Sequence, residues 1–180
     1  MKILIFGASG SGTTTLASCL SQRTGFPHLE VDNYYWKPTN PPFQEKVDKT
    51  VRQKNLLLDF QSYNNAIVCG SMVSWGKAWE TAFDFVIFIY LDNQTRMQRL
   101  KKREVERYGD QLLTDKRTQE NSEAFLEWAN KYDDPNFSGR SLKIHEDWIK
   151  KINRPVLRLD GLDALTNKTN YILEYLKKSN

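Results

Sequence analysis

The segment Lys2-Ile3-Leu4-Ile5-Phe6-Gly7-Ala8-Ser9-Gly10-Ser11-Gly12-Thr13-Thr14-Thr15 decides how the rest of the sequence is interpreted. Its apolar run predicts a strand at 2–6 that leads directly into a loop of small residues, and a helix is expected from Gly12 to about Thr24. Glycines let the backbone curl so that successive N–H groups converge, and a helix N-terminus adds unpaired donors. We therefore expect residues 7–15 to bind the phosphates of a nucleotide.

The loop matches the P-loop pattern at all but one position. Gly7 and Gly12 have the required four-residue gap, and Thr14 stands where the pattern places a Mg²⁺-binding hydroxyl. Thr13 occupies the position of the lysine that normally brings positive charge to the transferring phosphate. The remaining features still predict a site for ATP and Mg²⁺, whereas the missing lysine leaves open whether the protein catalyses phosphoryl transfer or only senses nucleotide.

Bulk properties restrict the class of protein. The chain has 180 residues with 39% hydrophobic content and a net charge of +4, which indicates one globular domain rather than disorder or a basic nucleic-acid binder. Cys19 and Cys69 form no CxxC pair, so both are expected to be buried and reduced. No segment predicts a signal peptide or a membrane span. We expect a cytoplasmic monomer or homodimer without a membrane or nucleic-acid partner; a sequence pI near 9.0 and exposed aromatics are all that favour nucleic acid.

Short apolar runs alternate with segments of helical period, which is typical of βαβ units around a parallel sheet. A second helix is expected at 45–63, with Val47, Val51 and Leu58 on one side, and Asp92 is expected to cap a later helix. The strands are predicted at 2–6, 27–31, 66–70, 85–91 and 156–159, and the last helix carries Leu162, Leu165, Thr169, Ile172 and Leu176. The prediction is a three-layer α/β fold of the P-loop NTPase type, with a five-stranded parallel sheet and helices on both faces.

A long insertion separates the fourth and fifth strands. More than sixty residues lie there, and their turn-forming clusters flank a helical stretch at 120–131. Insertions of this length in a compact domain are usually functional. We predict a helical lid at 104–140 within a single domain covering 1–180.

The insertion opens with a basic segment, Arg96-Met97-Gln98-Arg99-Leu100-Lys101-Lys102-Arg103-Glu104-Val105-Glu106-Arg107. On a helix Arg99 and Arg103 lie one turn apart on the same face. Arginines there are suited to bind phosphate, although a solvated basic face is a common alternative.

With these residues in view, the chain resembles the P-loop small-molecule kinases, the group containing adenylate, cytidylate and shikimate kinases. The archaeal type of cytidylate kinase also carries Gly-Thr-Thr at the loop. The resemblance implies that Arg99 packs on the base, that Arg103 touches phosphate, and that Arg140 acts as a lid arginine. We expect Arg140 to supply the charge missing at Thr13 on closure, with Arg107 and Arg117 as weaker candidates.

The acceptor side follows strands two and three. Asp32 is expected to hold an acceptor or take its proton, as an aspartate does in shikimate kinase, although a capping role is the alternative. Gly70 and Ser71 end the third strand, and Trp36, Trp75 and Trp79 are candidates to wall an aromatic acceptor. Glu30 is expected to point deeper into the strand.

These observations predict an ATP-dependent phosphotransferase that moves the γ-phosphoryl group to a small acceptor, a nucleoside monophosphate being the first choice. Arg52 and Lys54 are the only basic residues in the middle of the second helix, so no arginine cluster for a monophosphate is evident there. A neutral hydroxyl metabolite is therefore an alternative acceptor. A nucleotide-binding regulator is the alternative from another class. His28 and His145 do not suggest a metal site, and His145 is expected in the core.

Overall fold

A five-stranded parallel sheet forms the centre of the computed structural model, which describes residues 1–178. The strands lie in the order β2-β3-β1-β4-β5, so β1 pairs with β3 on one side and with β4 on the other. Their bounds are β1 Lys2–Gly7, β2 His28–Glu30, β3 Ala66–Cys69, β4 Phe85–Tyr90 and β5 Val156–Asp160. All five predicted strands are confirmed. Because the order reverses at β1, the crevice at its carboxyl end is where ligands bind in such sheets.

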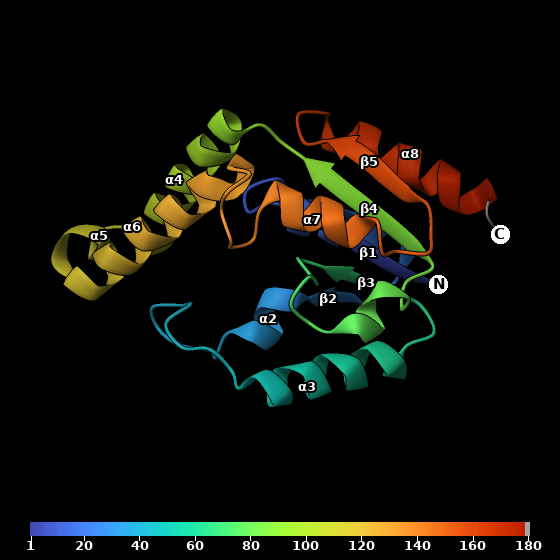
Figure 1. Ribbon diagram of the computed structural model, residues 1–180, viewed down its shortest axis with the longest axis horizontal. Helices are drawn as coiled ribbons and strands as arrows, with labels where there is room; N and C mark the ends of the chain where they lie inside the picture. The colour runs from blue at the N-terminus through green and yellow to red at the C-terminus, as the bar shows by residue number, and fades with distance from the viewer. Residues whose placement is uncertain (179–180) are drawn as a thin grey trace.

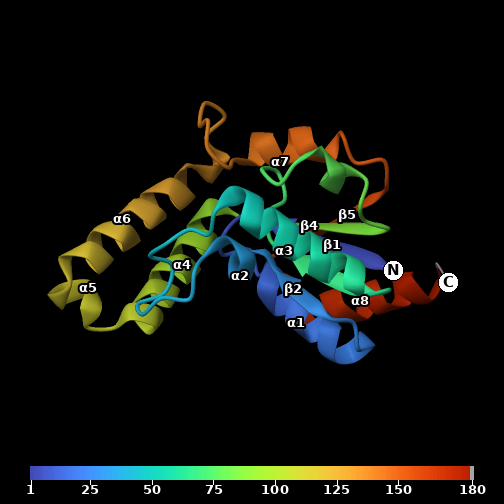
Figure 2. The same ribbon diagram turned by 90° about the horizontal axis from the view of Figure 1, so that it is seen from below.

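Helices cover both faces of the sheet, as predicted. On one face α1 (Thr13–Thr24) and α8 (Leu165–Lys178) pack against Ile3, Ile5 and Ile87. On the other, α3 (Lys49–Ser62) and α7 (Leu142–Ile149) bury Leu4, Phe6 and Phe88. Figures 1 and 2 show these two layers with the sheet between them.

Two helices begin later than expected. The second predicted helix starts at Lys49 because the Asp48 carboxylate accepts hydrogen bonds from the amides of Thr50 and Val51. Its buried side consists of Leu56 and Phe60, whereas Val51 and Leu58 are 48% and 54% exposed.

The last helix starts at Leu165, so Leu162 lies in the preceding turn and is 61% exposed. The amide of Leu162 donates to the Asp160 carboxylate there, which stabilises a turn in place of a helical start.

The insertion forms an arm of helices that projects from one end of the sheet, with α4 and α6 side by side (Figure 1). As expected, Asp92 caps α4, since its side chain accepts from the Thr95 amide at 2.8 Å. The arm comprises α4 (Asn93–Tyr108), α5 (Gln111–Thr114), α6 (Lys116–Asn130) and the 3-10 turn η2 (Lys131–Asp133). The smaller elements elsewhere are α2 (Val31–Tyr35) and the 3-10 turn η1 (Lys77–Glu80).

The two cysteines are free, as expected. Cys69 is buried at the end of β3, and Cys19 on α1 is half-buried. Burial and the neighbouring Glu30 carboxylate raise the pKa of the Cys69 thiol to about 12, which keeps it protonated. Across residues 1–178, no helix combines the length and the apolar character that a bilayer crossing requires.

Candidate nucleotide and acceptor site

The loop between β1 and α1 has a backbone that only small residues permit. A Cβ atom at Gly7 would lie 2.4 Å from the Ile89 carbonyl oxygen and 2.7 Å from Ser11 Oγ. Gly10 and Gly12 have φ values of 84° and 96°, in the left-handed region that favours glycine. Gly12 is also the N-cap residue of α1 and has no side chain to offer its amides. The first N–H groups of α1 therefore donate to no capping side chain, and such unpaired donors at a helix N-terminus can bind an anion.

A cavity of about 450 Å³ opens beside this loop, a volume that suits a nucleotide. Its walls come from three parts of the chain that the sheet brings together: the loop, helix α4 and the turn after β5. They are Gly10, Ser11, Gly12, Thr13, Thr14 and Thr15, then Arg99, Leu100 and Arg103, then Gly161, Asp163, Leu165 and Lys168. The structure thus brings residues 10–15 of the predicted loop together with both predicted arginines of α4, whereas Gly7, Ala8 and Ser9 do not line the cavity.

The hydroxyl of Thr14, the expected Mg²⁺ ligand, lies beside a carboxylate. Thr14 Oγ1 donates to the Glu30 carboxylate at 3.0 Å, and Glu30 ends β2. The expectation that Glu30 points deeper into the strand is wrong, because its side chain turns to the α1 face and reaches the loop. A hydroxyl and a carboxylate are hard oxygen ligands of the kind that Mg²⁺ prefers, so the residues present fit the ion. No cluster of three or more His, Cys, Asp or Glu suited to a metal occurs in the described part of the chain. The remaining ligands would therefore come from the nucleotide and water.

Asp32 lies in the first turn of α2, immediately after β2, and is exposed. Two half-buried arginines, Arg103 and Arg140, interact electrostatically with its carboxylate. Burial lowers the pKa of Arg103, Arg107 adds to this effect, and Glu104 and Asp32 oppose it. Burial also lowers the pKa of Arg140, and Asp32 is the main opposing charge. The structure thus brings Asp32, Arg103 and Arg140 to one place.

A third arginine approaches from α3. The guanidinium of Arg52 lies 4.0 Å from the ring centroid of Tyr35 and 5.6 Å from that of Trp75. Its Nε is buried and has no hydrogen-bond partner among the described residues. Buried donors are normally paired, so an unpaired one beside a polar site indicates a place for a ligand. The expectation of an acceptor side without an arginine cluster is therefore wrong.

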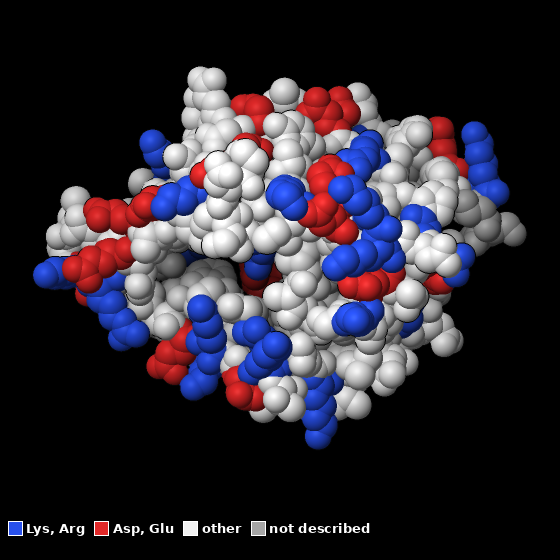
Figure 3. Space-filling model, viewed as in Figure 1, with Lys and Arg blue, Asp and Glu red and all other residues white. Residues whose placement is uncertain are grey.

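Residues 36–47 form a strap that joins the acceptor side to the arm. The strap is closed at its base by a bridge between Trp36 and Lys46. Its Pro42 carbonyl accepts from the Tyr108 hydroxyl at 3.2 Å, and its Gln44 side chain accepts from Asn121 at 2.9 Å. The Arg107 guanidinium packs on the strap's Phe43 ring at 4.4 Å. Figure 3 shows the hollow that remains between the arm and this side of the molecule, with acidic and basic side chains inside it.

The third strand contributes less to the acceptor side than expected. Trp75 and Trp79 are each 4% exposed and pack in the core with Phe60 and Phe83, so they do not wall a pocket. Trp36 is half-buried and packs edge-on against Phe43 of the strap. Gly70 lies at the end of β3 against Val31, and Ser71 follows it in the core.

The Ser71 side chain is hydrogen-bonded to a buried histidine. Its hydroxyl is 2.9 Å from His145 Nε2, and the Tyr132 hydroxyl is 2.8 Å from His145 Nδ1. His145 is fully buried, as expected, and burial together with Arg140 lowers its pKa to about 3. The neutral ring therefore joins the end of β3 to η2 and α7, the elements on either side of Arg140.

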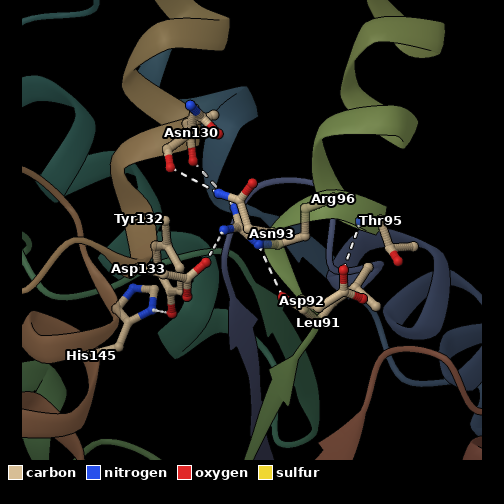
Figure 4. A network of polar contacts seen from close by, with 10 residues as sticks. Leu91, Asp92, Asn93, Thr95, Arg96, Asn130, Tyr132, Asp133 and His145 are labelled. Carbon is tan, nitrogen blue, oxygen red and sulfur yellow. Dashed lines mark hydrogen bonds and ion pairs between the residues drawn. The ribbon is translucent and has the colours of Figure 1, made fainter.

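The base of the arm is held by Arg96, which the sequence did not single out for a structural role. This side chain is fully buried and donates to the Leu91 and Ala129 carbonyls and, at 2.6 Å, to the Asp133 carboxylate (Figure 4). Its guanidinium also stacks on Tyr132, which bonds His145. The arm's root is therefore fixed to the core by a buried guanidinium group. The lid expected at 104–140 stays a prediction.

Comparison with known proteins agrees with this geometry. A family model described as an AAA domain matches residues 3–125. The protein YqaC of Bacillus subtilis is 36% identical over 178 residues, which cover 99% of this chain and 98% of YqaC. Cytidylate kinase 2 of Borreliella afzelii is 27% identical over 126 residues, 62% of this chain and 67% of that protein.

Solved structures show the same fold. The shikimate kinase of Acinetobacter baumannii, in complex with shikimate, superposes with a TM-score of 0.59 at 15% identity, over 99% of this chain and 94% of that one. The expected resemblance is confirmed: the chain belongs to the AAA-domain family that the model describes, together with YqaC, and it has the fold of the P-loop small-molecule kinases.

Proposed function

We propose that this protein is an ATP-dependent phosphotransferase that moves the γ-phosphoryl group to a small anionic acceptor, with a nucleoside monophosphate as the expected acceptor. One observation carries the proposal. Arg103 lines the cavity beside the phosphate loop and also lies within the electrostatic reach of Asp32. The donor site and the acceptor side therefore meet at a single side chain, as direct transfer between two bound substrates requires.

The charges around Asp32 favour an anionic acceptor over a neutral one. Arg103 and Arg140 interact with Asp32, and Arg52 packs on Tyr35, which also interacts with Arg140. The Nε atoms of Arg52 and Arg103 are buried and have no partner in the described chain. Guanidinium groups bind phosphate and carboxylate through paired hydrogen bonds. Tyr35, Trp36 and Phe43 form the adjacent aromatic surface, which suits a base or another flat ring.

In the proposed reaction, an acceptor oxygen bonds to the γ-phosphorus as the bond from that phosphorus to the β,γ-bridging oxygen breaks and ADP leaves. The amides of residues 7–15 would hold the phosphates, and Asp32 would orient the acceptor or take the proton of a hydroxyl acceptor. A Mg²⁺ ion held near Thr14 and Glu30 would neutralise charge on the phosphates. Arg99 would lie against the base of the donor nucleotide.

The test is ADP release from Mg²⁺-ATP with and without pooled acceptors. The pools are nucleoside monophosphates, nucleosides, and small hydroxy acids or sugars. Release that depends on the monophosphate pool supports the proposal, and release that depends only on a neutral pool contradicts the anionic acceptor. ATP binding without stimulated release by any pool favours the regulator, whose supporting observation is Thr13 in place of lysine.

A further inference from the structure

The phosphate loop lacks its lysine, yet a phosphoryl transfer needs positive charge on the terminal phosphate. We propose that Arg103 of α4 takes the place of that lysine, and that Arg140 serves the acceptor instead. This inference rests on the proposed function. It follows from which cations line the cavity, how each is held, and how α4 is fixed to the loop.

Three cationic side chains among the described residues line the cavity beside the loop: Arg99, Arg103 and Lys168. Two of them are directed to the turn after β5. Lys168 Nζ donates to the Asp160 and Gly161 carbonyls at 3.3 and 3.1 Å. Arg99 Nη2 lies 3.5 Å from the same Gly161 carbonyl. Both therefore belong to the end of the cavity away from the sheet's acceptor side.

Arg103 differs from these two in both its position and its bonding. It lies within the electrostatic reach of Asp32 on the acceptor side, and its guanidinium packs 5.7 Å from the centroid of the Phe125 ring. Its buried Nε has no partner among the described residues. A half-buried guanidinium between the loop and Asp32, with a donor unused, is placed to receive the oxygens of a phosphoryl group in transfer.

Helix α4 holds Arg103 at a fixed position relative to the loop. A Cβ atom at Gly10 would lie 3.1 Å from Leu100 Cγ and 3.2 Å from the Arg96 carbonyl oxygen, so the helix packs directly on the loop backbone. Arg103 follows Leu100 by one helical turn, and Arg96 below it is anchored in the core. A P-loop lysine is likewise held rigidly beside the phosphates, whereas an arginine on a mobile lid is not.

Arg140 is held differently and does not line this cavity. Asp32 is the charge that most opposes the lowering of the Arg140 pKa by burial. Arg140 also lies close enough to His145 to lower the pKa of that buried ring. It packs 5.4 Å from the centroid of Trp128. These contacts place it with the acceptor. The expectation that Arg140 supplies the charge missing at Thr13 is therefore replaced by one in which Arg103 does so.

Nucleotide binding tests this inference without any acceptor. Dissociation constants for Mg²⁺-ATP and Mg²⁺-ADP would be measured by calorimetry on the wild type, Arg103→Met, Thr13→Lys and the double variant. Methionine keeps packing against Phe125, and exposed Lys101→Met on the same helix is the matched control. We expect Arg103→Met to weaken ATP about tenfold while changing ADP less than about threefold. Thr13→Lys should restore most of the lost preference in the double variant.

The outcomes are distinguishable from failure of the proposed function. If the wild type binds neither nucleotide, the proposed function falls and this inference falls with it. If the wild type binds ATP but Arg103→Met leaves the ATP-to-ADP ratio unchanged, the inference alone is overturned. The same holds if Arg140→Met lowers that ratio more than Arg103→Met does. Circular dichroism and thermal melting of each variant show whether the fold is kept, and Arg103→Lys provides a milder change if methionine unfolds the chain.

Discussion

The donor site and the acceptor side are built in different ways. The proposed donor site consists of one contiguous loop, whose backbone amides would hold the phosphates, with two arginines of α4 beside it. The acceptor side is assembled from single side chains on α2, on α3 and ahead of α7, together with a strap that reaches the arm. Backbone amides bind any phosphate in the same way, whereas an array of side chains selects one acceptor.

This difference predicts that substitutions in the two regions have different effects. Changes that distort the loop should weaken nucleotide binding whatever the acceptor, because main-chain groups of the loop are proposed to hold the phosphates. Changes on the acceptor side should affect turnover or the acceptor's KM and leave ATP binding intact. The predictions for Asp32, Arg52 and Gly70 test whether the two regions are separable in this way, and the prediction for His145 tests the buried hydrogen bonds beside the acceptor side.

The largest effect is expected at Asp32. We predict that Asp32→Asn lowers kcat by about a hundredfold or more, because the neutral amide cannot balance Arg103 and Arg140 and so cannot orient these groups and the acceptor for transfer. The ATP dissociation constant should change less than about threefold, since Asp32 is not part of the loop. Steady-state kinetics with calorimetry measures both. Asp110→Asn, an exposed aspartate in the turn after α4, is the control. Equal losses in both quantities would show that the regions are not separable.

The buried histidine predicts a pH dependence of stability. Burial lowers the pKa of His145 from 6.5 to about 3, so the unfolded chain takes up this proton first as pH falls. The contribution of His145 to the free energy of unfolding should therefore be complete above pH 6.5. Between pH 6.5 and 3 the free energy of unfolding should decrease by up to about 1.4 kcal/mol per pH unit. Urea titrations across that window measure the slope.

Carboxylates titrate in the lower part of the same window, so a variant is needed to isolate the histidine. His145→Gln should be less stable than the wild type at pH 7 and should show a shallower slope between pH 6.5 and 5. An unchanged slope would mean that the His145 ring does not stay neutral with hydrogen bonds at both nitrogens.

A smaller effect is expected at Arg52. We predict that Arg52→Ala raises the acceptor KM about tenfold with little change in the KM for ATP, because one charge-assisted hydrogen bond to the acceptor is lost. Arg52→Lys keeps the charge but loses the planar fork and should be intermediate. Arg23→Ala, exposed at the end of α1, is the control. A larger change for ATP than for the acceptor would assign Arg52 to the donor side.

The same difference explains what the sequence could reveal. The phosphate loop could be predicted because its chemistry depends on glycines and hydroxyls at fixed spacing next to a strand and a helix. The pair Arg99 and Arg103 could be predicted because helical periodicity brings residues four apart to one face. The strands were predictable from their short apolar runs, because strands of a parallel sheet that is covered on both faces are hydrophobic on both sides.

The acceptor side could not be predicted as readily because no spacing rule links its members. Arg140 comes near Asp32, and Arg52 near Tyr35, only through the folding of the chain, and nothing near either arginine in the sequence marks it. Glu30 was misjudged because the side-chain direction at the end of a three-residue strand depends on the register with β3. Trp75 and Trp79 were misjudged because tryptophan serves both cores and pockets, and burial alone distinguishes the two.

The smallest effect compares two glycines. Gly70 on the acceptor side and Gly25 at the end of α1 both have positive φ, 118° and 74°, so alanine at either position pays backbone strain of about 1 kcal/mol. Only at Gly70 would the new Cβ also meet a neighbour, Val31 Cβ at 2.8 Å, directly before Asp32. We therefore predict that Gly70→Ala lowers the melting temperature more than Gly25→Ala, and that only Gly70→Ala changes the acceptor KM, by displacing α2. Equal melting temperatures and equal KM values would mean that α2 shifts without cost and that the packing of Val31 against Gly70 does not position Asp32.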